Sequence, residues 1–413
     1  MSDHHPFVDG EPIPGSSGEA TLYNPATGES IGSVSRAGVA DVDRAVTVAR
    51  DRYDEGVWRR APVRERRDVL RAIADLIRRD RERLAEMESA NAGKPITAAR
   101  GEIGAVATVF DFYAGAVDKF HGQTIPGNAD GTLMTFREPI GVCAAITPWN
   151  FPMLILSWKT APALAMGNSV VVKPAEVTPL TALALADLAV EAGLPPGVLN
   201  VVTGRGSEAG DALVRHPKVG KISFTGSTEV GAGVMATAAS GIKRVSLELG
   251  GKSANLVFAD ADLDECVESS VFAVYDNAGQ DCCARSRILV EKGIFDEFAD
   301  RFVARARSIV VGDTADEATE MGPLITPSHR ETVESYLEIG ESEGATLVVG
   351  GERVGERGNY LSPAVFTGAR PGMRIVEEEI FGPVVALTPF ADEDEAIRLA
   401  NDSVYGLSGS IWT

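Results

Sequence analysis

Cysteine and histidine are scarce in this sequence, which has four and five of them among 413 residues. Cys143 and Cys266 stand far apart and alone, so neither a disulfide framework nor a zinc site built from paired Cys-x-x-Cys motifs is indicated. We expect reduced thiols and a cytoplasmic protein. Cys282 and Cys283 are adjacent, and no histidine lies near them in the sequence, so we expect no bound metal.

Excess positive charge and long apolar segments are lacking as well. The 39 basic and 59 acidic residues leave a net charge of −20, which argues against non-specific attraction to nucleic acid or to an anionic membrane. The N-terminus lacks the basic and apolar regions of a secretory signal peptide. The longest apolar run, 140–158, is interrupted by two prolines and an asparagine. We therefore expect no membrane segment and, from the length, two or three domains.

The first part of the chain shows three patterns. Up to about residue 40 it is polar and punctuated by Gly and Pro, which predicts short strands and turns over the surface. Apolar residues at helical spacing predict one long amphipathic helix over 63–90, which a Gly-Lys-Pro segment ends. Residues 122–136 form an extended excursion that we interpret as an arm used in assembly.

The middle of the chain alternates between short β-rich runs and helical runs. Strands are predicted at 142–146, 169–173, 199–202, 221–225 and 244–247, with helices at 154–166, 179–192, 208–214 and 228–239. Consecutive strands joined by helical crossovers must be parallel, which predicts an α/β fold with a doubly wound parallel sheet. Ligands bind such sheets beyond the carboxyl ends of the strands. The loops there are rich in Gly, Pro and polar residues: 147–150, 173–176, 204–206, 226–227 and 248–251.

The alternation continues beyond residue 251. Strands are predicted at 254–258 and 287–290, and helices at 263–275, 294–311 and 327–340. A second α/β domain is the simplest account, and we expect its mouth to present the loop around Cys282. The predicted division is a first domain of residues 1–120 and 140–250, an arm of residues 121–139, and a second domain of residues 251–413.

The polar loop from Gly279 to Cys283 admits three interpretations: a buried structural pair, a reactive nucleophile with a bystander, or half of a metal site. A polar loop between a predicted helix and strand is an unfavourable place for inert core, so we interpret one cysteine as a nucleophile. Such a thiol usually needs a base, and no histidine (positions 4, 5, 121, 216 and 329) lies in a loop resembling a site. Glu248 is the better candidate because it precedes a Leu-Gly-Gly turn that lets backbone approach a ligand, although a strand-end acid is also typical of a solvated cap.

Phosphate recognition is indicated at 224–231, where a strand, a glycine turn and a helix start would present backbone N–H groups to an anion. The Gly-x-Gly-x-x-Gly fingerprint is absent, and residues 204–210 approach it with one residue too many. Both segments also fit ordinary helix N-caps. Together they favour a dinucleotide without its usual signature.

In combination these features resemble one family, the NAD(P)-dependent aldehyde dehydrogenases. Six stretches match it in order and rough spacing, over nearly the whole chain: Pro-Trp-Asn-Phe-Pro at 148–152, Lys-Pro-Ala-Glu at 173–176, Phe-Thr-Gly-Ser at 224–227, Leu-Glu-Leu-Gly-Gly-Lys at 247–252, Gly-Gln-Asp-Cys at 279–282 and Glu-Ile-Phe-Gly-Pro at 379–383. The resemblance implies an NAD-binding first domain, an oligomerisation arm and a catalytic second domain.

The resemblance also implies a mechanism. Cys282 would attack the aldehyde as a thiolate, with the Asn150 amide and the Cys282 backbone N–H stabilising the oxyanion. After hydride transfer to the nicotinamide, Glu248 would activate the water that hydrolyses the thioester to a carboxylic acid. Lys159 would belong either to a proton relay or to a structural ion pair, and we favour the structural role.

For the cofactor, the resemblance places Lys173 and Glu176 at the adenosine ribose, Ser227 at the pyrophosphate, and Glu379 with Phe381 at the nicotinamide ribose and ring. A carboxylate at Glu176 would repel a 2′-phosphate, which favours NAD over NADP. The same comparison adds further cofactor-binding residues: Thr147, Pro148, Trp149, Gly206, Gly226 and Leu249.

Five residues match positions that line the family's aldehyde tunnel: Phe151, Ile155, Trp158, Asp276 and Asp281. Two carboxylates and a tryptophan face would attract a cation, so we hypothesise an amino- or betaine-type aldehyde as substrate. The alternative is that these acids are solvated or capping and that the substrate is a general aliphatic or aromatic aldehyde.

The sequence stops at Thr413 inside a predicted strand, whereas family members continue. We expect an unpaired sheet edge there, and a homodimer or homotetramer as the assembly. Two other functions stay open: a non-catalytic or weakly active NAD-binding relative or fragment, and a CoA-acylating semialdehyde dehydrogenase. Glu248 counts against the second of these.

Overall fold

The computed structural model describes residues 3–127 and 131–413, which form two compact units. The first unit comprises Ser30–Asn91 and Ala98–Glu248 with the N-terminal stretch up to Tyr23, and the second comprises Asn24–Glu29, Ala92–Thr97 and Leu249–Thr413. Two short segments from the first hundred residues thus belong to the second unit, whereas the sequence pattern assigned all of 1–120 to the first domain.

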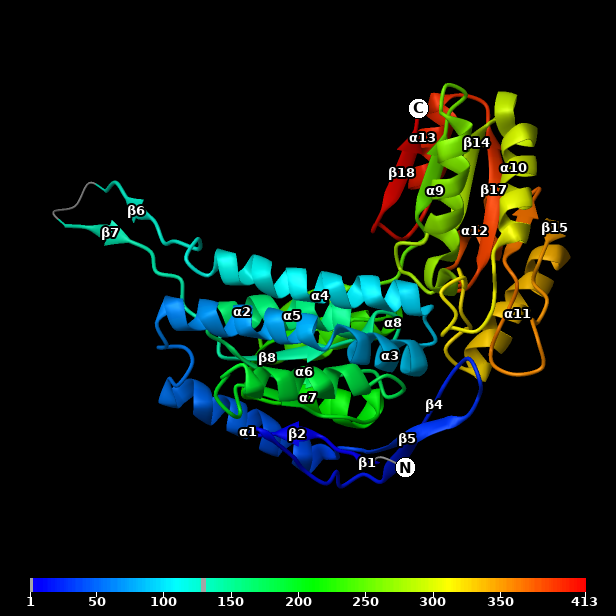
Figure 1. The fold of residues 1–413 in the computed structure, drawn as a ribbon. Coiled ribbons are helices and arrows are strands. Elements are labelled where there is room, and N and C mark those ends of the chain that lie inside the picture. The colour runs from blue at the N-terminus through cyan, green and yellow to red at the C-terminus, as the bar shows by residue number, and fades with distance from the viewer. Residues whose placement is uncertain (1–2, 128–130) are drawn as a thin grey trace. The chain divides into compact units, whose positions relative to one another are not determined.

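A seven-stranded sheet forms the centre of the first unit (Figure 1). Its strands, from edge to edge, are β12 (Arg244–Glu248), β11 (Val219–Thr225), β8 (Val142–Ile146), β9 (Ser169–Lys173), β10 (Leu199–Val201), β2 (Phe7–Val8) and β3 (Glu11–Pro12). The five strands from β12 to β10 are parallel, and β2 and β3 add an antiparallel edge. The predicted doubly wound α/β fold is confirmed.

Helices cover both faces of this sheet. On one face lie α1 (Val39–Glu55), α7 (Asp211–Arg215) and α8 (Thr228–Ala239); on the other lie α5 (Pro152–Ala165) and α6 (Leu180–Glu191), against which α2 (Val63–Arg79) packs. The buried strands are apolar throughout, as in β8 and β9, because both of their faces are covered. Two more helices, α3 (Arg81–Ala92) and α4 (Ile96–Ala116), follow α2 in the chain.

The single helix predicted over 63–90 is wrong, because the chain breaks at Asp80. The Asp80 N–H ends α2 by bonding to the Leu76 carbonyl, and the Asp80 carbonyl accepts from the N–H of Leu84 in α3. The Asp80 side chain meanwhile accepts from Arg83 at 2.8 Å. The apolar spacing continues through the break, so the period alone did not reveal it.

The predicted surface strands at the N-terminus are partly buried. Besides β2, they form a three-stranded sheet of β1 (Asp3–His4), β5 (Ser30–Ser35) and β4 (Glu19–Tyr23). Leu22 and Val34 of this sheet pack with Leu180 of α6 in a small apolar cluster. This segment therefore adds to the core instead of only lying over it.

The predicted arm is an extended hairpin of β6 (Thr124–Ile125) and β7 (Leu133–Met134), which projects from the rest of its unit in Figure 1. Residues 128–130 of the arm lie outside the described residues. The described strand residues of the hairpin are exposed, including Ile125 at 43%, Leu133 at 51% and Met134 at 50%.

The second unit is built on a six-stranded sheet in the order β15 (Thr346–Val349), β16 (Ala364–Thr367), β17 (Val384–Phe390), β14 (Arg287–Glu291), β13 (Ala254–Val257) and β18 (Gly409–Trp412). All neighbours are parallel except β15 and β16. Its helices are α9 (Leu263–Tyr275), α10 (Phe295–Ser308), α11 (Pro327–Ser342), α12 (Arg374–Glu377) and α13 (Glu393–Asn401). The predicted second α/β domain is thus present as a sheet of its own.

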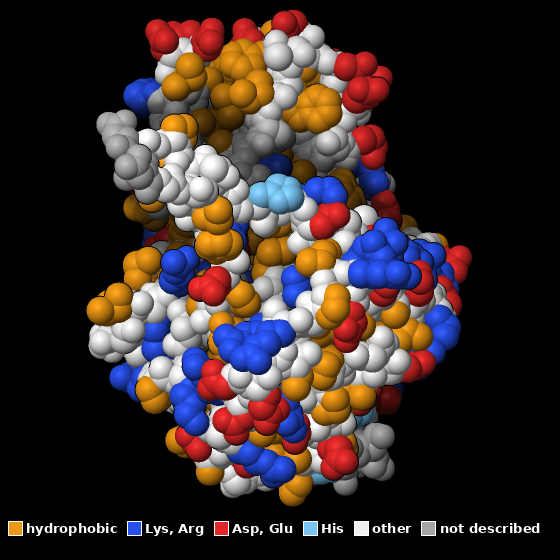
Figure 2. Space-filling model, turned by 90° about the vertical axis from the view of Figure 1, so that its left-hand side faces the viewer, with side chains coloured by type: hydrophobic (Ala, Val, Ile, Leu, Met, Phe, Trp, Pro, Cys, Tyr) orange, Lys and Arg blue, Asp and Glu red, His pale blue; other side chains and the backbone are white. Residues whose placement is uncertain are grey.

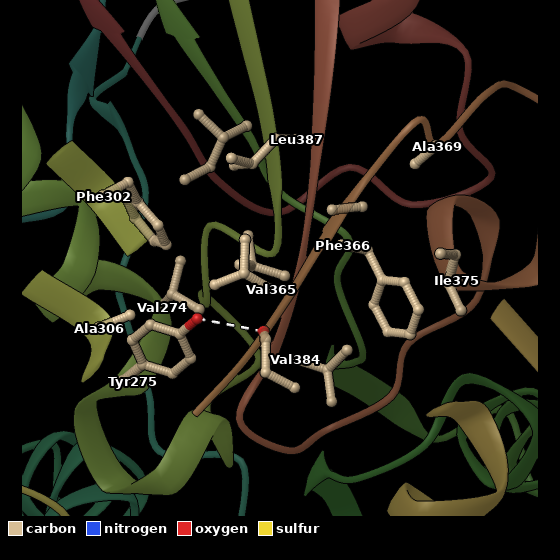
Figure 3. Packing of buried hydrophobic residues seen from close by; sticks show 14 of the residues in the cluster. Val274, Tyr275, Phe302, Ala306, Val365, Phe366, Ala369, Ile375, Val384 and Leu387 are labelled. Atoms are coloured by element: carbon tan, nitrogen blue, oxygen red, sulfur yellow. Dashed lines mark hydrogen bonds between the residues drawn. The ribbon is translucent and has the colours of Figure 1, made fainter. Parts of the chain in front are cut away.

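An apolar core joins this sheet to α9 and α10 (Figure 3). Tyr275, the last residue of α9, is 2% exposed, and its hydroxyl donates to the Ala364 carbonyl at 3.1 Å. Phe302 of α10 lies near the Tyr275 ring, with ring centroids 6.1 Å apart. The C-terminal end of α9 is therefore rigidly placed just before the loop that contains the two adjacent cysteines.

The surface charge is mixed. On the face shown in Figure 2, basic and acidic side chains are interspersed. Among the described residues many charged side chains form ion pairs, as in Arg50 with Asp54 at 2.7 Å and Arg374 with Glu378 at 2.8 Å. Within the described part of the chain, no helix combines the length and apolar character that crossing a membrane requires.

Candidate functional site

The carboxyl ends of the parallel strands in the first unit meet at one edge, as the sequence predicted. Ile146 pairs with Lys173 on one side and with Phe224 on the other, and Thr225 pairs with Glu248. The loops that follow are tied to this edge, since the Thr147 N–H donates to the Lys173 carbonyl at 3.1 Å. Candidate residues separated by a hundred positions in the sequence are thereby brought side by side.

Lys173 and Glu176 lie at this edge with a partner that the sequence did not reveal. The Lys173 ammonium is buried and donates to the Pro174 carbonyl at 2.8 Å. Burial lowers the pKa of Lys173 to about 8, against the opposing effect of Glu176. The Glu176 carboxylate accepts from Arg36 Nε at 2.7 Å. Because 140 residues separate these two, no local pattern pointed to Arg36.

The predicted phosphate-binding turn follows β11. Ser227 caps helix α8, its hydroxyl accepting from the Val230 N–H at 3.3 Å, so the start of a twelve-residue helix lies at the sheet edge. The hydroxyl of Thr225, just before Gly226, is buried and has no hydrogen-bond partner among the residues that the structure describes. Gly206 begins a single π-helical turn, Gly206–Gly210, after β10. The edge thus combines helix starts with an unsatisfied buried hydroxyl, which suits an anionic, polar ligand.

The loop after β8 leads into helix α5. Asn150 is 4% exposed, Pro148 and Trp149 are partly buried, and α5 begins at Pro152. The Met153 N–H in the first turn donates to the buried carboxylate of Glu88 at 3.2 Å. This contact attaches the start of α5 to a buried carboxylate, three residues after Asn150 in the chain.

Of the predicted tunnel residues on and before α5, Ile155 is buried, Phe151 is partly buried and Trp158 is 52% exposed. Trp158, Lys159, Ser223 and Glu248 line one cavity of about 540 Å³ within the first unit. The Lys159 ammonium lies 3.2 Å from the Ser223 hydroxyl. Burial lowers the pKa of Lys159 to about 8, whereas the charge of Glu248 acts in the opposite direction. Glu248 itself is exposed at the end of the edge strand β12.

The adjacent cysteines lie in a turn of the second unit, between α9 and β14. Three consecutive residues, Asn277, Ala278 and Gly279, adopt left-handed backbone conformations, with φ of 51°, 56° and 68°. Left-handed Asn277 and Ala278 are strained, and the side chains around them must hold them. Asn277 Nδ2 donates to the Gln280 carbonyl at 3.1 Å, and Gln280 Nε2 donates back to the Asn277 carbonyl at 2.9 Å.

Asp281 organises the turn that follows. The Ala284 N–H donates to the Asp281 carbonyl at 3.0 Å, and the Cys283 N–H donates to the Asp281 carboxylate at 2.9 Å, a pattern typical of Asp at the first position of a turn. Cys282 and Cys283 occupy the two central positions, with their sulfurs 4.0 Å apart. A carboxylate oxygen of Asp281 lies within 4.8 Å of both sulfurs.

The two thiols share one environment and ionise as a pair. The hydrogen bond to Cys283, burial and the nearby carboxylates of Asp281 and Glu379 raise the pKa of Cys282, while the same hydrogen bond lowers the pKa of Cys283. We expect the first ionisation of the pair to be accessible and the second to be strongly opposed, because two adjacent thiolates would then lie beside the Asp281 carboxylate. Burial also raises the pKa of Asp276, against the charge of Lys94.

Glu379 is joined to the cysteine turn through one glycine. The Gly251 N–H donates to the Glu379 carboxylate at 3.1 Å. A Cβ placed on Gly251 would approach the Cys282 carbonyl oxygen to 2.3 Å, and one on Gly250 would approach Glu379 Oε2 to 2.1 Å. The turn after Leu249 therefore needs its glycines, because their backbone lies directly against both groups. Burial raises the pKa of Glu379, and the bond from Gly251 opposes this shift.

These loops lie at the amino ends of the second sheet. Leu249 and the two glycines precede β13, Cys282 precedes β14, and Phe381 precedes β17. Arg287, the first residue of β14, pairs with Ala254, the first residue of β13, and with Ala386, the third residue of β17. The Cys282 turn thus lies at the amino edge of the second sheet, whereas the candidate loops of the first sheet lie at its carboxyl edge.

The sequence around His329 does not resemble a site, but its ring nitrogen Nε2 lies 2.8 Å from the Phe381 carbonyl oxygen. The contact joins residues 52 positions apart, so no sequence signal identified it. Gln280 was also missed: its side-chain oxygen accepts from the Ile325 N–H at 2.9 Å.

Comparisons with known proteins identify the family. The family model described as "Aldehyde dehydrogenase family" matches residues 13–413. A betaine aldehyde dehydrogenase of Bacillus subtilis (strain 168) is 45% identical over 413 residues, covering 98% of this chain and 84% of that protein. Human retinal dehydrogenase 2 is 49% identical over 395 residues, covering 95% of this chain and 76% of that protein. The crystal structure of a betaine aldehyde dehydrogenase from Staphylococcus aureus in complex with NAD+ superposes with a TM-score of 0.97 at 40% identity, covering 99% of this chain and 82% of that one.

Proposed function

Because the chain belongs to the aldehyde dehydrogenase family and is an NAD-dependent aldehyde dehydrogenase, we propose that it oxidises its aldehyde to a carboxylic acid through a thioester on Cys282. The observation that carries this proposal is the place of Gly251, which touches the Cys282 carbonyl and donates to Glu379. The Cys282 turn and the Glu379 carboxylate, a candidate cofactor-binding group, are therefore both held against the backbone of Gly251.

In the proposed reaction the Cys282 thiolate forms a bond to the aldehyde carbon, and the carbonyl electrons move to oxygen. The Asn150 amide and the Cys282 backbone N–H stabilise that oxygen. When bound, NAD supplies the acceptor for the hydride that leaves the carbon. Glu248 then takes a proton from water, which attacks the thioester, releases the carboxylic acid and restores the thiolate.

The residues present fit NAD in both units. In the first unit, the unsatisfied Thr225 hydroxyl beside the start of α8 suits a pyrophosphate near Gly226 and Ser227, with Lys173 and Glu176 at the adenosine ribose. Thr147, Pro148, Trp149 and Gly206 belong to the loops at the same edge. In the second unit, the absence of a side chain at Gly250 leaves room for the Glu379 carboxylate. This carboxylate would bind the nicotinamide ribose, with Leu249 and Phe381 nearby in the chain.

For the substrate we propose a cationic aldehyde of the betaine type. The Asp281 carboxylate within 4.8 Å of the Cys282 sulfur supports it. In a thiohemiacetal of trimethylammonioacetaldehyde, three bonds of about 1.5–1.8 Å separate sulfur from nitrogen, so the cation would lie beside that carboxylate. Asp276, whose charge interacts with that of Asp281, adds a second acid, and Trp158 is an aromatic side chain that is 52% exposed. The similarity to a betaine aldehyde dehydrogenase points the same way, whereas that to a retinal dehydrogenase favours the alternative of a neutral aldehyde.

A panel of aldehydes assayed by NADH absorbance tests the proposal. We expect Cys282→Ala to abolish turnover, Cys283→Ala to retain it, and Glu248→Gln to accumulate a protein-bound acyl group detectable by mass spectrometry. Turnover surviving in Cys282→Ala would refute the thioester route. If the purified protein binds NAD but oxidises no aldehyde of the panel, the non-catalytic alternative holds, and acyl transfer to added CoA would favour the acylating one.

We also propose a homodimer or homotetramer in the cytoplasm. The exposed Leu133 and Met134 on the β6–β7 hairpin support assembly, because exposed apolar strand residues mark interaction sites, and four free cysteines suit a reducing compartment. Light scattering coupled to size exclusion would test the assembly, with Leu133→Lys combined with Met134→Lys expected to lower the mass. An unchanged mass would exclude the hairpin as the interface.

A further inference from the structure

Helix α11 presents one face to the loop of residues 378–382, which contains Glu379 and Phe381. His329, Val333 and Tyr336 are spaced i, i+4 and i+7, so they share that face. The Tyr336 hydroxyl donates to the Glu378 carboxylate at 2.6 Å, and His329 Nε2 lies 2.8 Å from the Phe381 carbonyl oxygen. Between them, a Cβ on Gly382 would approach the Val333 side chain to 2.6 Å. Three contacts therefore attach this cofactor loop to a single helix face.

The proton position on His329 follows from its partner. Burial lowers the pKa of His329, so the ring is neutral near pH 7 and carries one proton. A carbonyl oxygen only accepts hydrogen bonds, so this proton is on Nε2 and is donated to Phe381. The His329 and Phe381 rings also meet edge to face, with centroids 6.2 Å apart.

The residue that His329 holds is strained. Phe381 has a φ of 58°, a left-handed conformation that a bulky side chain rarely adopts. Such a conformation persists only where its surroundings fix it. The hydrogen bond from His329 to the Phe381 carbonyl is one of those constraints. Phe381 lies two residues after Glu379 in the chain.

The same helix is fixed against the cysteine turn. Just before α11, the Ile325 N–H donates to the Gln280 side chain at 2.9 Å. On the other side, a Cβ on Gly279 would approach the Gly382 carbonyl oxygen to 2.2 Å, so the two loops pack backbone to backbone. A contact from α11 to the cofactor loop therefore sets that loop relative to Cys282 as well.

We propose that His329 is a positioning residue for NAD binding: its Nε2–H holds the Phe381 backbone so that the Glu379 carboxylate and the Phe381 ring keep their binding positions. The inference rests on the proposed cofactor role of Glu379 and Phe381. Tyr336 acts on the same loop through Glu378, so two polar contacts and one apolar contact hold the loop to the helix.

The test measures NAD binding directly, by calorimetry on the full chain, together with steady-state kinetics. His329→Phe keeps a ring against Phe381 and removes the donor; we expect the NAD Kd to rise about tenfold, equivalent to about 1.4 kcal/mol. The KM for NAD should rise in parallel, by more than kcat falls, and the KM for aldehyde should stay within about twofold. His329→Gln, whose amide nitrogen reaches a similar place, should restore most of the affinity, and Tyr336→Phe provides a second variant with the same expected direction.

Two outcomes would overturn the inference: an NAD Kd unchanged in both His329→Phe and Tyr336→Phe, or a rise that His329→Gln fails to reverse. His121→Phe, at an exposed histidine of the first unit, controls for the substitution itself. Glu379→Ala separates this failure from failure of the proposed function. If Glu379→Ala weakens NAD binding while the His329 variants do not, only the positioning role is wrong; if Glu379→Ala also has no effect, the assigned cofactor site is wrong.

Discussion

Replacing Asp281 by Asn should make the Cys282 thiol more acidic. The Asp281 carboxylate lies within 4.8 Å of the Cys282 sulfur and is one cause of its raised pKa. Asn has nearly the same shape and can still accept the Cys283 N–H, so the turn is retained while the charge is removed. The substitution therefore isolates an electrostatic effect at the proposed nucleophile.

The size of the effect follows from Coulomb's law. Two unit charges at about 4.8 Å interact by roughly 3.5 kcal/mol at an effective dielectric constant of about 20 and by roughly 0.9 kcal/mol in water. Both groups are partly exposed, so we expect a value near the lower limit, about 1–1.5 kcal/mol. This corresponds to a decrease of about one pKa unit.

Iodoacetamide alkylation as a function of pH measures this change, because only the thiolate reacts. Cys283→Ser serves as the common background, and Cys143 and Cys266 are buried, so the rate reports Cys282. We expect the midpoint of the rate profile to move down by about one unit in Asp281→Asn. Asp296→Asn, an exposed acid at the start of α10, changes the net charge equally and should leave the midpoint in place.

The same variant tests the substrate. The ratio of kcat/KM for trimethylammonioacetaldehyde to that for 3,3-dimethylbutanal, its neutral isostere, should fall about tenfold in Asp281→Asn. A midpoint that stays in place or rises would refute the electrostatic account of the thiol. An unchanged ratio, or no preference for the cation in the parent protein, would refute the betaine-type substrate.

Three further substitutions have defined outcomes. Glu176→Gln removes a carboxylate that repels a 2′-phosphate and leaves Arg36 in place, so the ratio of kcat/KM for NADP to that for NAD should rise about tenfold or more. Gly250→Ala should displace the Glu379 carboxylate, which the new Cβ would approach to 2.1 Å, and raise the NAD Kd about tenfold in a calorimetric titration. Tyr275→Phe removes the hydrogen bond to the buried Ala364 carbonyl, so urea unfolding should show a loss of about 0.5–1.5 kcal/mol.

Each of these has a control. Adding Arg36→Gln to Glu176→Gln should reverse the gain with NADP, and a gain that persists would show that Arg36 takes no part. Gly101→Ala, within α4, should leave NAD binding unchanged, because a Cβ there would meet no described atom within 4 Å outside the helix's own backbone. A loss below about 0.5 kcal/mol in Tyr275→Phe would mean that the hydroxyl contributes nothing at the end of α9.

The alternation of strands and helices could be predicted from the sequence, because it depends on patterns among neighbouring residues. A buried parallel strand is apolar throughout, and its crossover helix repeats at 3.6 residues, so β8, β9 and α8 were predicted close to their bounds. The topology rule then placed the loops of the first sheet at one edge, since parallel strands end together. The motif resemblance identified the family on the same stretches, including the Gly-Gln-Asp-Cys sequence.

The contacts between residues far apart in the sequence could not be predicted, because a local pattern does not indicate which distant residue a side chain will contact. Arg36 pairs with Glu176 across 140 positions, Gly251 with Glu379 across 128, and His329 with Phe381 across 52. Each depends on how the sheets and helices pack, as does the left-handed backbone that reverses the chain before Cys282. The sequence by itself determined the elements, the first sheet and the chemical identity of the thiol loop; only the tertiary structure decided which groups hold Glu176, Glu379 and Phe381, because those groups meet through packing and not through spacing.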